Sequence, residues 1–242
     1  MSVAGPPQDA NRPLGGSAAA EPQAWGDHTR AARRITLAYT GASGLPFGLR
    51  LLECLLGAGV HVDLVYSPAA QMVARQECDL VLPTQPREAT RMLAARYRAG
   101  EGQLIVYGRE DWLAPMASGS NPGDAMAICP CTMGTLGAIA SGIADNLIER
   151  AADVMLKERR PLVLVPRETP LSAIHLENML KLARAGAIIL PPSPGFYAHP
   201  QSVADLVDFI VARILDHLGV AQDLMPRWGD DRPAALPPTA RI

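Results

Sequence analysis

The chain has 242 residues, of which 48% are hydrophobic and 19% are charged, and its formal net charge is −2. This length and composition are typical of one compact globular domain. The near-neutral charge excludes an overall basic field that would attract nucleic acid. No apolar run approaches about 18 residues, so we expect no membrane-spanning helix.

The cysteine content and the N-terminal residues indicate the cellular compartment of the protein. Four cysteines are too few and too scattered for a disulfide framework: Cys54, Cys78, Cys129 and Cys131. The N-terminus lacks the charged start and the apolar block of a signal peptide. We therefore expect the protein in the cytoplasm.

Composition divides the chain into three parts. Residues 1–32 are rich in Ala, Pro, Gly and Gln and have no periodic apolar face. Such a segment cannot bury enough surface to offset its ordering entropy, which predicts a disordered N-terminal extension. The predicted domain covers 33–220, and the Pro-rich residues 221–242 form a C-terminal tail.

The first predicted elements form a strand–helix–strand unit. Residues 35–39 predict a strand, and the small-residue turn TGASG at 40–44 leads into a helix at 47–56 whose leucines share one face. A second strand at 61–66 is followed by Ser67, a typical helix N-cap, with proline at the first helical position. A crossover of this length implies parallel strands.

Strands and helices continue to alternate along the chain. Further strands are predicted at 104–107, 124–129, 161–166 and 187–190. Further helices are predicted at 86–98, 146–159, 172–185 and 203–218, and another opens after a turn at 130–135. Apolar strands that alternate with helices indicate a parallel sheet covered on both faces. The predicted fold class is therefore a single α/β domain.

Polar residues follow four of the predicted strands. They are 40–44, Ser67, 129–135 and the pair Arg167-Glu168. The carboxyl ends of parallel strands share one edge of the sheet, where ligands bind, so we expect these residues to cluster. The glycines of the first turn allow close backbone approach, and the helix start that follows attracts phosphate. The turn matches neither GxGxxG nor Walker A nor GxSxG, so a plain tight turn stays an alternative.

Several of these residues also have structural interpretations. The position of Ser67 fits a helix N-cap as well as it fits a contact with a ligand. The hydroxyls of Thr132 and Thr135, three residues apart on a helix start, either cap that helix or bind a phosphate or ribityl chain. Cys129 and Cys131 lack the partner ligands of a zinc site, so we expect buried core thiols and no metal.

Two cations point to a second phosphate. Arg150 and Lys157 lie seven residues apart, two turns along one face of a predicted helix. Together they could grip a phosphate group, although a solvated helix face is the ordinary alternative. Tyr197 follows a Pro/Gly loop that could form a rim of the site, or it is an aromatic partly buried beneath that loop.

Six segments carry the most specific pattern of the chain. They are TGASG at 40–44, ASGS at 117–120, CPCTMGTLGAIASGIADNLIERAADV at 129–154, LKERRPLVLVPRE at 156–168, HLENMLKL at 175–182 and PGFY at 194–197. Together they resemble the UbiX-type flavin prenyltransferases. The resemblance extends from Arg33 to Trp228.

The resemblance implies a fold, an assembly and a reaction. The fold would be a Rossmann-like, flavodoxin-type parallel sheet, and the assembly a homo-oligomer, a dodecamer with sites at subunit junctions. The enzyme would join the dimethylallyl group of dimethylallyl monophosphate to N5 and C6 of reduced FMN, releasing phosphate without a metal. The product, prenylated FMN, would serve a UbiD-type decarboxylase, for example in ubiquinone biosynthesis.

The same resemblance assigns site residues by motif. It implies FMN contacts at Gly41, Ala42, Ser43, Ser67, Thr132, Thr135 and Arg167, and at Ser118 and Ser120 from a neighbouring subunit. It places substrate-binding residues at Arg150, Lys157, Trp112, Tyr197 and Arg213, and implies catalytic roles for Glu168, Lys157, Tyr197 and Glu77. Many relatives have a hydroxyl where this chain has Met133, and we expect FMN binding to survive this departure.

Two other functions stay open on the residues alone. One is an FMN-dependent cysteine decarboxylase, which relies on an early catalytic histidine and a PxMNxxMW-type segment that this chain lacks. The other is a non-catalytic carrier that delivers FMN to a decarboxylase. The cations at Arg150, Lys157 and Arg213 argue against a carrier, which has no second phosphate to bind.

Overall fold

The computed structural model describes Met1 and residues 33–225. The chain divides into two units, Met1–Ala31 and Ala32–Ile242, and every helix and strand described below belongs to the second unit. The extension predicted at 1–32, apart from Met1, lies outside the described residues. Most of the predicted tail, 226–242, also lies outside them.

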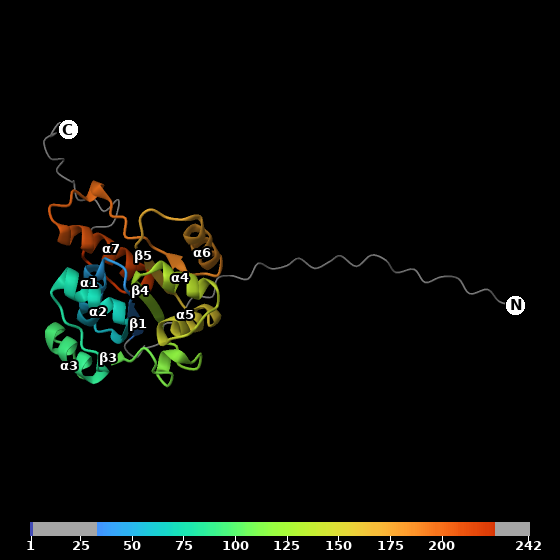
Figure 1. Cartoon of the computed structure of the whole chain (residues 1–242), viewed down its shortest axis with the longest axis horizontal. Coiled ribbons are helices and arrows are strands. Elements are labelled where there is room, and N and C mark those ends of the chain that lie inside the picture. Colours follow the sequence, from blue (N-terminus) through green and yellow to red (C-terminus); the bar gives the residue numbers. More distant parts are fainter. Residues whose placement is uncertain (2–32, 226–242) are drawn as a thin grey trace, which may run out of the picture. The chain divides into compact units, whose positions relative to one another are not determined.

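Six parallel strands form one sheet in the order β3-β2-β1-β4-β5-β6 (Figure 1). They are β1 (Arg34–Tyr39), β2 (His61–Tyr66), β3 (Leu104–Tyr107), β4 (Ala125–Cys131), β5 (Leu162–Pro166) and β6 (Ile188–Ile189). The predicted parallel, Rossmann-like sheet is confirmed. Its order is the Rossmann order, not the 2-1-3-4-5 order of flavodoxin. The order reverses between β1 and β4, and ligands bind at such a switch point.

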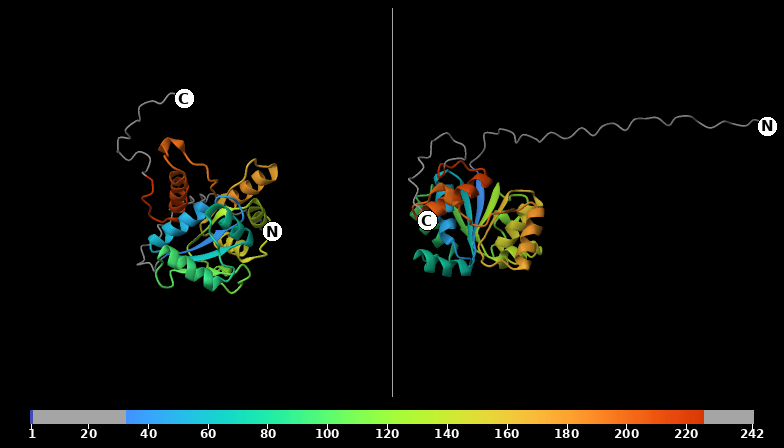
Figure 2. Two further views of the ribbon diagram at one scale, coloured as in Figure 1. Left: turned by 60° about the vertical axis from the view of Figure 1, so that its left-hand side comes forward. Right: turned by 90° about the horizontal axis from the view of Figure 1, so that it is seen from above.

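Helices cover both faces of the sheet (Figure 2). One face carries α1 (Leu45–Gly57), α2 (Pro68–Cys78), α3 (Pro86–Tyr97) and α7 (Val203–Leu218). The other carries α4 (Met133–Ala140), α5 (Leu147–Lys157) and α6 (Ala173–Arg184). Two short 3-10 helices, η1 (Pro115–Ala117) and η2 (Phe196–Ala198), lie in the connecting segments.

The pleat of the strands distributes side chains between two hydrophobic cores. In β1, Ile35, Leu37 and Tyr39 point into the core under α1 and α7, whereas Ala38 points into the core under α4 and α5. Each of these residues is fully buried. Since burying a large apolar side chain stabilises a fold by about 1.5–3 kcal/mol, the central strand anchors both layers.

Most predicted elements coincide with the observed ones. The strands at 61–66 and 104–107 and the helix at 203–218 have the predicted bounds. One prediction was wrong, because β4 continues through Pro130 to Cys131 rather than ending at Cys129. A register shift after Ile128 lets Cys131 pair with Pro166 of β5, so a residue without an N–H is accommodated inside a strand. No helix within 33–225 is both long and apolar enough to cross a membrane.

Candidate active site

The four polar strand ends lie side by side, because β2, β1, β4 and β5 are consecutive in the sheet. Hydrogen bonds join them directly. Ser67 N donates to Tyr39 O at 3.0 Å. Arg167 N donates to Cys131 O at 3.4 Å, and Arg167 Nε donates to Ser43 O at 3.3 Å. The predicted cluster at the carboxyl edge of the sheet is confirmed.

The first turn is held close to α2. A Cβ placed on Gly41 would lie 2.4 Å from the Cβ of Ala69, in the first turn of α2, so only glycine fits. Gly44 precedes α1 with φ 110°, a conformation that favours glycine. Gly41 therefore lets the first turn pack directly against α2.

Glu77 occupies the start of α1. Its Oε2 accepts hydrogen bonds from Gly44 N at 2.9 Å and from Leu45 N at 3.0 Å. The expectation that these helix N–H groups are open to a phosphate is thus corrected, since a carboxylate of the same chain already satisfies two of them. A ligand phosphate at this edge has to use other donors or displace Glu77.

Hydroxyl groups line the ends of β2 and β4. Ser67 caps α2 by accepting from Ala70 N at 3.1 Å. Thr132 caps α4 by accepting from Thr135 N at 3.1 Å, and its hydroxyl donates to Thr135 Oγ1 at 3.0 Å. Both capping interpretations are confirmed. Capping uses the acceptor side of a hydroxyl, and the Thr132 hydroxyl also uses its donor on Thr135. The O–H groups of Ser67 and Thr135 can still donate to a ligand.

Met133, the departure from the family pattern, lies in the core beneath α4 with 9% of its surface exposed. Its side chain is therefore packed away from the hydroxyl-lined edge. This geometry supports the expectation that Met133 leaves cofactor binding intact.

Arg150, Lys157 and the ASGS loop form a separate group on α5. Arg150 Nε donates to Ala117 O at 2.9 Å, and Lys157 pairs with Glu158 beside Gly119. In this loop Ser118 and Ser120 share a hydrogen bond of 2.9 Å between their hydroxyls. Because α5 runs back toward the amino ends of the strands, Lys157 lies near the edge opposite Ser43. The six residues of β1 alone span about 20 Å.

Tyr197 and Arg213 lie on the other side of the sheet from α5. Tyr197, in η2, packs edge to face against Phe209 of α7 with ring centroids 5.8 Å apart and is 61% exposed. Arg213 of α7 pairs with Asp216 at 3.1 Å. One copy of the chain therefore does not bring Arg213 together with Arg150 and Lys157. Trp112, also 46% exposed, lies in the loop after β3.

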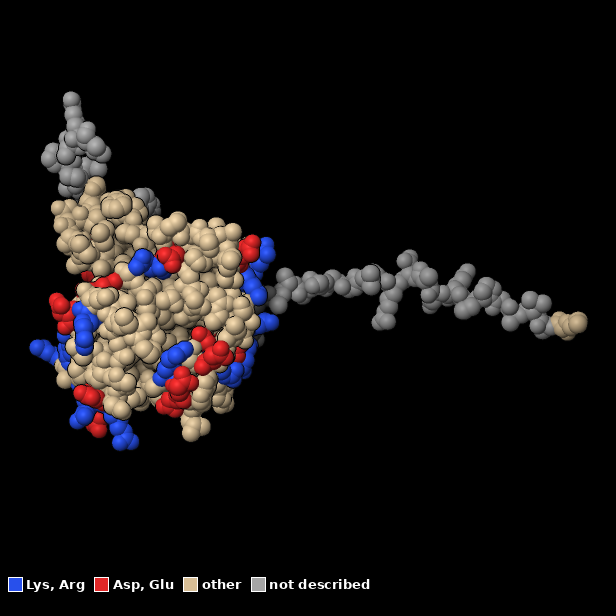
Figure 3. Space-filling view, viewed as in Figure 1, with Lys and Arg blue, Asp and Glu red and all other residues tan. Residues whose placement is uncertain are grey.

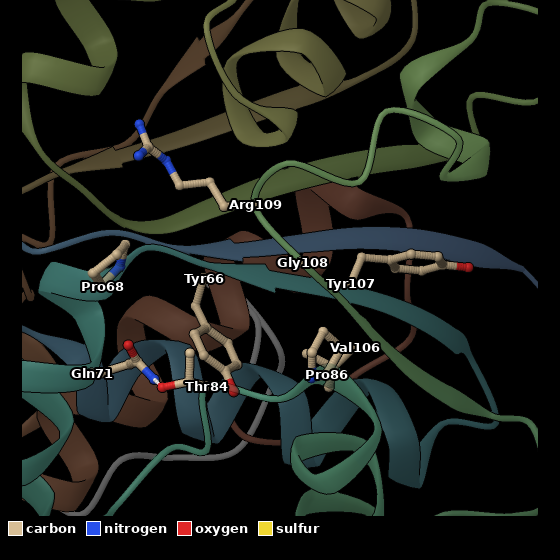
Figure 4. Close-up of a pocket in the computed structure, with 9 residues that line it drawn as sticks. All are labelled: Tyr66, Pro68, Gln71, Thr84, Pro86, Val106, Tyr107, Gly108 and Arg109. Carbon is tan, nitrogen blue, oxygen red and sulfur yellow. Dashed lines mark hydrogen bonds between the residues drawn. The ribbon is translucent and has the colours of Figure 1, made fainter.

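A small cavity lies beside Ser67, at the carboxyl ends of β2 and β3 (Figure 4). Its volume is ≈ 110 Å³. Gln71 and Thr84 lie side by side in it, joined by a hydrogen bond of 3.2 Å, whereas the Arg109 side chain extends away from them. Ligand pockets usually measure about 300–1,000 Å³, so this cavity does not enclose a flavin by itself. On the face seen in Figure 3, basic and acidic side chains are interspersed, which gives that face no single-sign field.

The two cysteines of β4 are buried thiols. Cys129 and Cys131 are both 0% exposed and free. Burial raises the pKa of Cys131 to about 12 and also raises the pKa of Cys129 well above its usual value. The predicted core thiols are thus confirmed, and neither is a nucleophile near neutral pH.

We expect native Cys129 and Cys131 to resist alkylation. With a pKa near 12, only about one Cys131 in 10⁴ is a thiolate at pH 8, and both sulfurs are shielded. Peptide mapping after iodoacetamide treatment should find both unlabelled in native protein, whereas all four cysteines react in denaturant. Fast native labelling of either residue would contradict this burial.

Comparison with known proteins agrees with the fold. The model of the Flavoprotein family matches residues 26–215, so the chain is a flavoprotein by family. It is 60% identical to the flavin prenyltransferase UbiX of Pseudomonas aeruginosa over 197 residues, covering 81% of this chain and 94% of that protein. A UbiX-like relative of Bacillus subtilis is 45% identical. Within the flavoproteins, the chain belongs to the UbiX-type flavin prenyltransferases.

Solved structures give the same assignment. AnUbiX (PadA1), solved in complex with FMN and dimethylallyl pyrophosphate, has a TM-score of 0.73 and 44% identity, covering 82% of this chain and 98% of that one. A dodecameric FMN-dependent UbiX-like decarboxylase from Escherichia coli O157:H7 has a TM-score of 0.71 and 42% identity, covering 81% and 98%. The cysteine decarboxylase TvaF shares the fold alone, at 17% identity and a TM-score of 0.51.

Proposed function

We propose that this protein joins the dimethylallyl group of dimethylallyl monophosphate to reduced FMN and releases phosphate, giving prenylated FMN. The observation that carries the proposal is the intact strand-end set of glycines, hydroxyls and Arg167 in a chain 60% identical to a flavin prenyltransferase. The relative solved with FMN and dimethylallyl pyrophosphate supports the pair of ligands.

The carboxyl edge fits a flavin mononucleotide. Gly41 lets the first turn pack against Ala69 of α2, and the O–H groups of Ser67 and Thr135 supply donors for phosphate or ribityl oxygens, with Thr132 holding Thr135. Arg167, fixed to the first turn through Ser43 O, places a guanidinium beside them. We therefore assign FMN binding to this edge, with Ala42 and Ser43 in the turn.

We propose that a second copy of the chain completes the site. Lys157 lies at the end of α5, away from the carboxyl edge, and Arg150 near the start of the same helix is bound to Ala117 O, beside Ser118 and Ser120. The dodecameric relative supports assembly of many copies, and we propose the same assembly here. The α5 group of one copy would then face the carboxyl edge of another.

We assign each group a chemical task. Reduced FMN supplies the nucleophilic ring positions when bound. Cleaving the allylic C–O bond leaves negative charge on phosphate, which Lys157, Arg150 and Arg213 would stabilise electrostatically. Glu168 and Tyr197 would hold or pass protons as phosphate departs, while Trp112 would shelter the allylic cation with its ring.

Mass spectrometry of the flavin tests this function. Purified protein should convert reduced FMN and dimethylallyl monophosphate into prenylated FMN under anaerobic conditions in the presence of EDTA. A parallel assay with the diphosphate should give less product, because the chain has no Asp-rich metal-binding motif. Recovery of unmodified FMN alone would contradict the proposed prenyltransferase activity and favour the alternative of a non-catalytic FMN carrier.

Two wider assignments follow as proposals. The product would serve a UbiD-type decarboxylase, because prenylated flavin has no further use in the chemistry proposed for this site. The free, scattered cysteines support a reducing compartment, and we propose the cytoplasm.

A further inference from the structure

A buried hydroxyl joins the ends of β1 and β4. Thr40, 2% exposed, donates from Oγ1 to Pro130 O at 2.8 Å. The same oxygen accepts from Thr132 N at 2.8 Å, and Thr40 N also donates to Pro130 O at 3.2 Å. One side chain thus uses both its donor and its acceptor to hold two residues of the neighbouring strand end.

The hydroxyl reinforces the strand pairing where the regular register of β1 and β4 ends. Residue pairing between β1 and β4 runs as far as Ala38 opposite Ile128. Pro130 has no N–H to donate, and the register of β4 shifts between Ile128 and Cys131. Past this point one backbone hydrogen bond, from Thr40 N to Pro130 O, still joins the two strand ends, whereas the N–H of Thr132 is held by the Thr40 side chain.

Thr132 in turn sets the hydroxyls of the flavin edge. It caps α4, accepts from Thr135 N and donates to Thr135 Oγ1. The contacts form one chain from Thr40 through Thr132 to Thr135. A shift of Thr132 N would therefore move both hydroxyls at once.

We propose that Thr40 is a positioning residue that sets the affinity of the site for flavin by fixing Thr132 and Thr135. The inference rests on the proposed function, because it takes flavin as the ligand of these hydroxyls. Thr40 itself touches Pro130 and Thr132 through its side chain and acts on the ligand through them.

The same strand offers a matched control. Thr36 of β1 is 1% exposed, and its hydroxyl has no hydrogen-bond partner among the described residues. Replacement by valine removes a buried hydroxyl in both cases, and only at position 40 does the loss break contacts. Thr36→Val should leave flavin binding unchanged and stability equal or higher.

FMN titration by fluorescence quenching tests the proposal. Thr40→Val should weaken FMN binding about tenfold or more, while Thr40→Ser and Thr36→Val bind as the wild type does. If Thr40→Val gives no folded protein, Thr40→Cys replaces it, since a thiol of serine shape is a weak donor and acceptor. Equal weakening by Thr40→Ser, or unchanged affinity in the folded Val or Cys variant, would overturn the inference.

A double-mutant cycle separates positioning from general destabilisation. Thr40→Val should cost much less affinity in a Thr135→Val background than in the wild type, because the hydroxyl it positions is already gone. Additive losses would contradict action through Thr135. If wild-type protein and Thr36→Val both fail to bind FMN, the proposed function fails instead.

Discussion

Lys157→Ala is expected to lower the rate of flavin prenylation by about 10²–10³-fold while FMN stays bound. The loss reflects a missing cation opposite the departing phosphate, an electrostatic contribution of a few kcal/mol to the barrier. FMN affinity should stay unchanged because Lys157 lies on α5 beside Glu158 and Gly119, apart from the strand ends to which we assign FMN binding. Single-turnover product formation and FMN titration measure the two effects separately.

Arg160→Ala is the matched control for this prediction. Arg160 lies three residues after Lys157, just beyond α5, and has no assigned role in the site. It should retain both turnover and flavin. If Lys157→Ala loses flavin together with turnover, Lys157 belongs to the flavin half of the site and the division made above is wrong.

Gly41→Ala is expected to abolish FMN binding. The new Cβ would lie 2.4 Å from the Cβ of Ala69, which the first turn of α2 holds in place, so the first turn must shift. That shift would also disturb Ser43, whose carbonyl accepts from Arg167. FMN fluorescence should then remain unquenched at concentrations that saturate the wild type.

Gly57→Ala gives the comparison for a glycine without such contacts. A Cβ at Gly57, at the end of α1, meets nothing within 4 Å. Flavin binding should be unchanged, and stability should rise slightly because alanine favours the helix. Normal FMN affinity in Gly41→Ala would show that the first turn is not a wall of the flavin site.

Much of the architecture could be predicted from local pattern. The apolar strands and the turn residues between elements mark a parallel sheet, and parallel strands place 40–44, Ser67, 129–135 and Arg167 on one edge. The thiols of β4 were predictable as well, because they lie in an apolar run without partner ligands. Hydrophobic periodicity and turn preferences depend on residues close together in the sequence, so the strands, helices and turns could be predicted from it.

Other features depend on contacts between distant residues. Glu77 reaches Gly44 from the far end of α2, and Thr40 reaches Pro130 on the neighbouring strand, 90 residues further along the chain. No local sequence pattern predicts either contact. The position of the Thr40 hydroxyl directly after a buried strand did indicate a residue at the edge of the site. Arg150 and Arg213 are separated because α5 and α7 cover opposite faces of the sheet. The spacing of residues along one helix does not reveal which face that helix covers.

Subunit mixing tests the central claim most directly. Arg167→Ala damages the carboxyl edge and Lys157→Ala damages the α5 group, so each variant alone should form almost no prenylated FMN. Co-expression with two different tags, followed by purification on both, gives mixed assemblies. If two copies build each site, about a quarter of the sites combine an intact edge with an intact α5 group. Prenylated FMN should then return to about a quarter of the wild-type level, whereas mixed assemblies as inactive as the single variants would contradict the account.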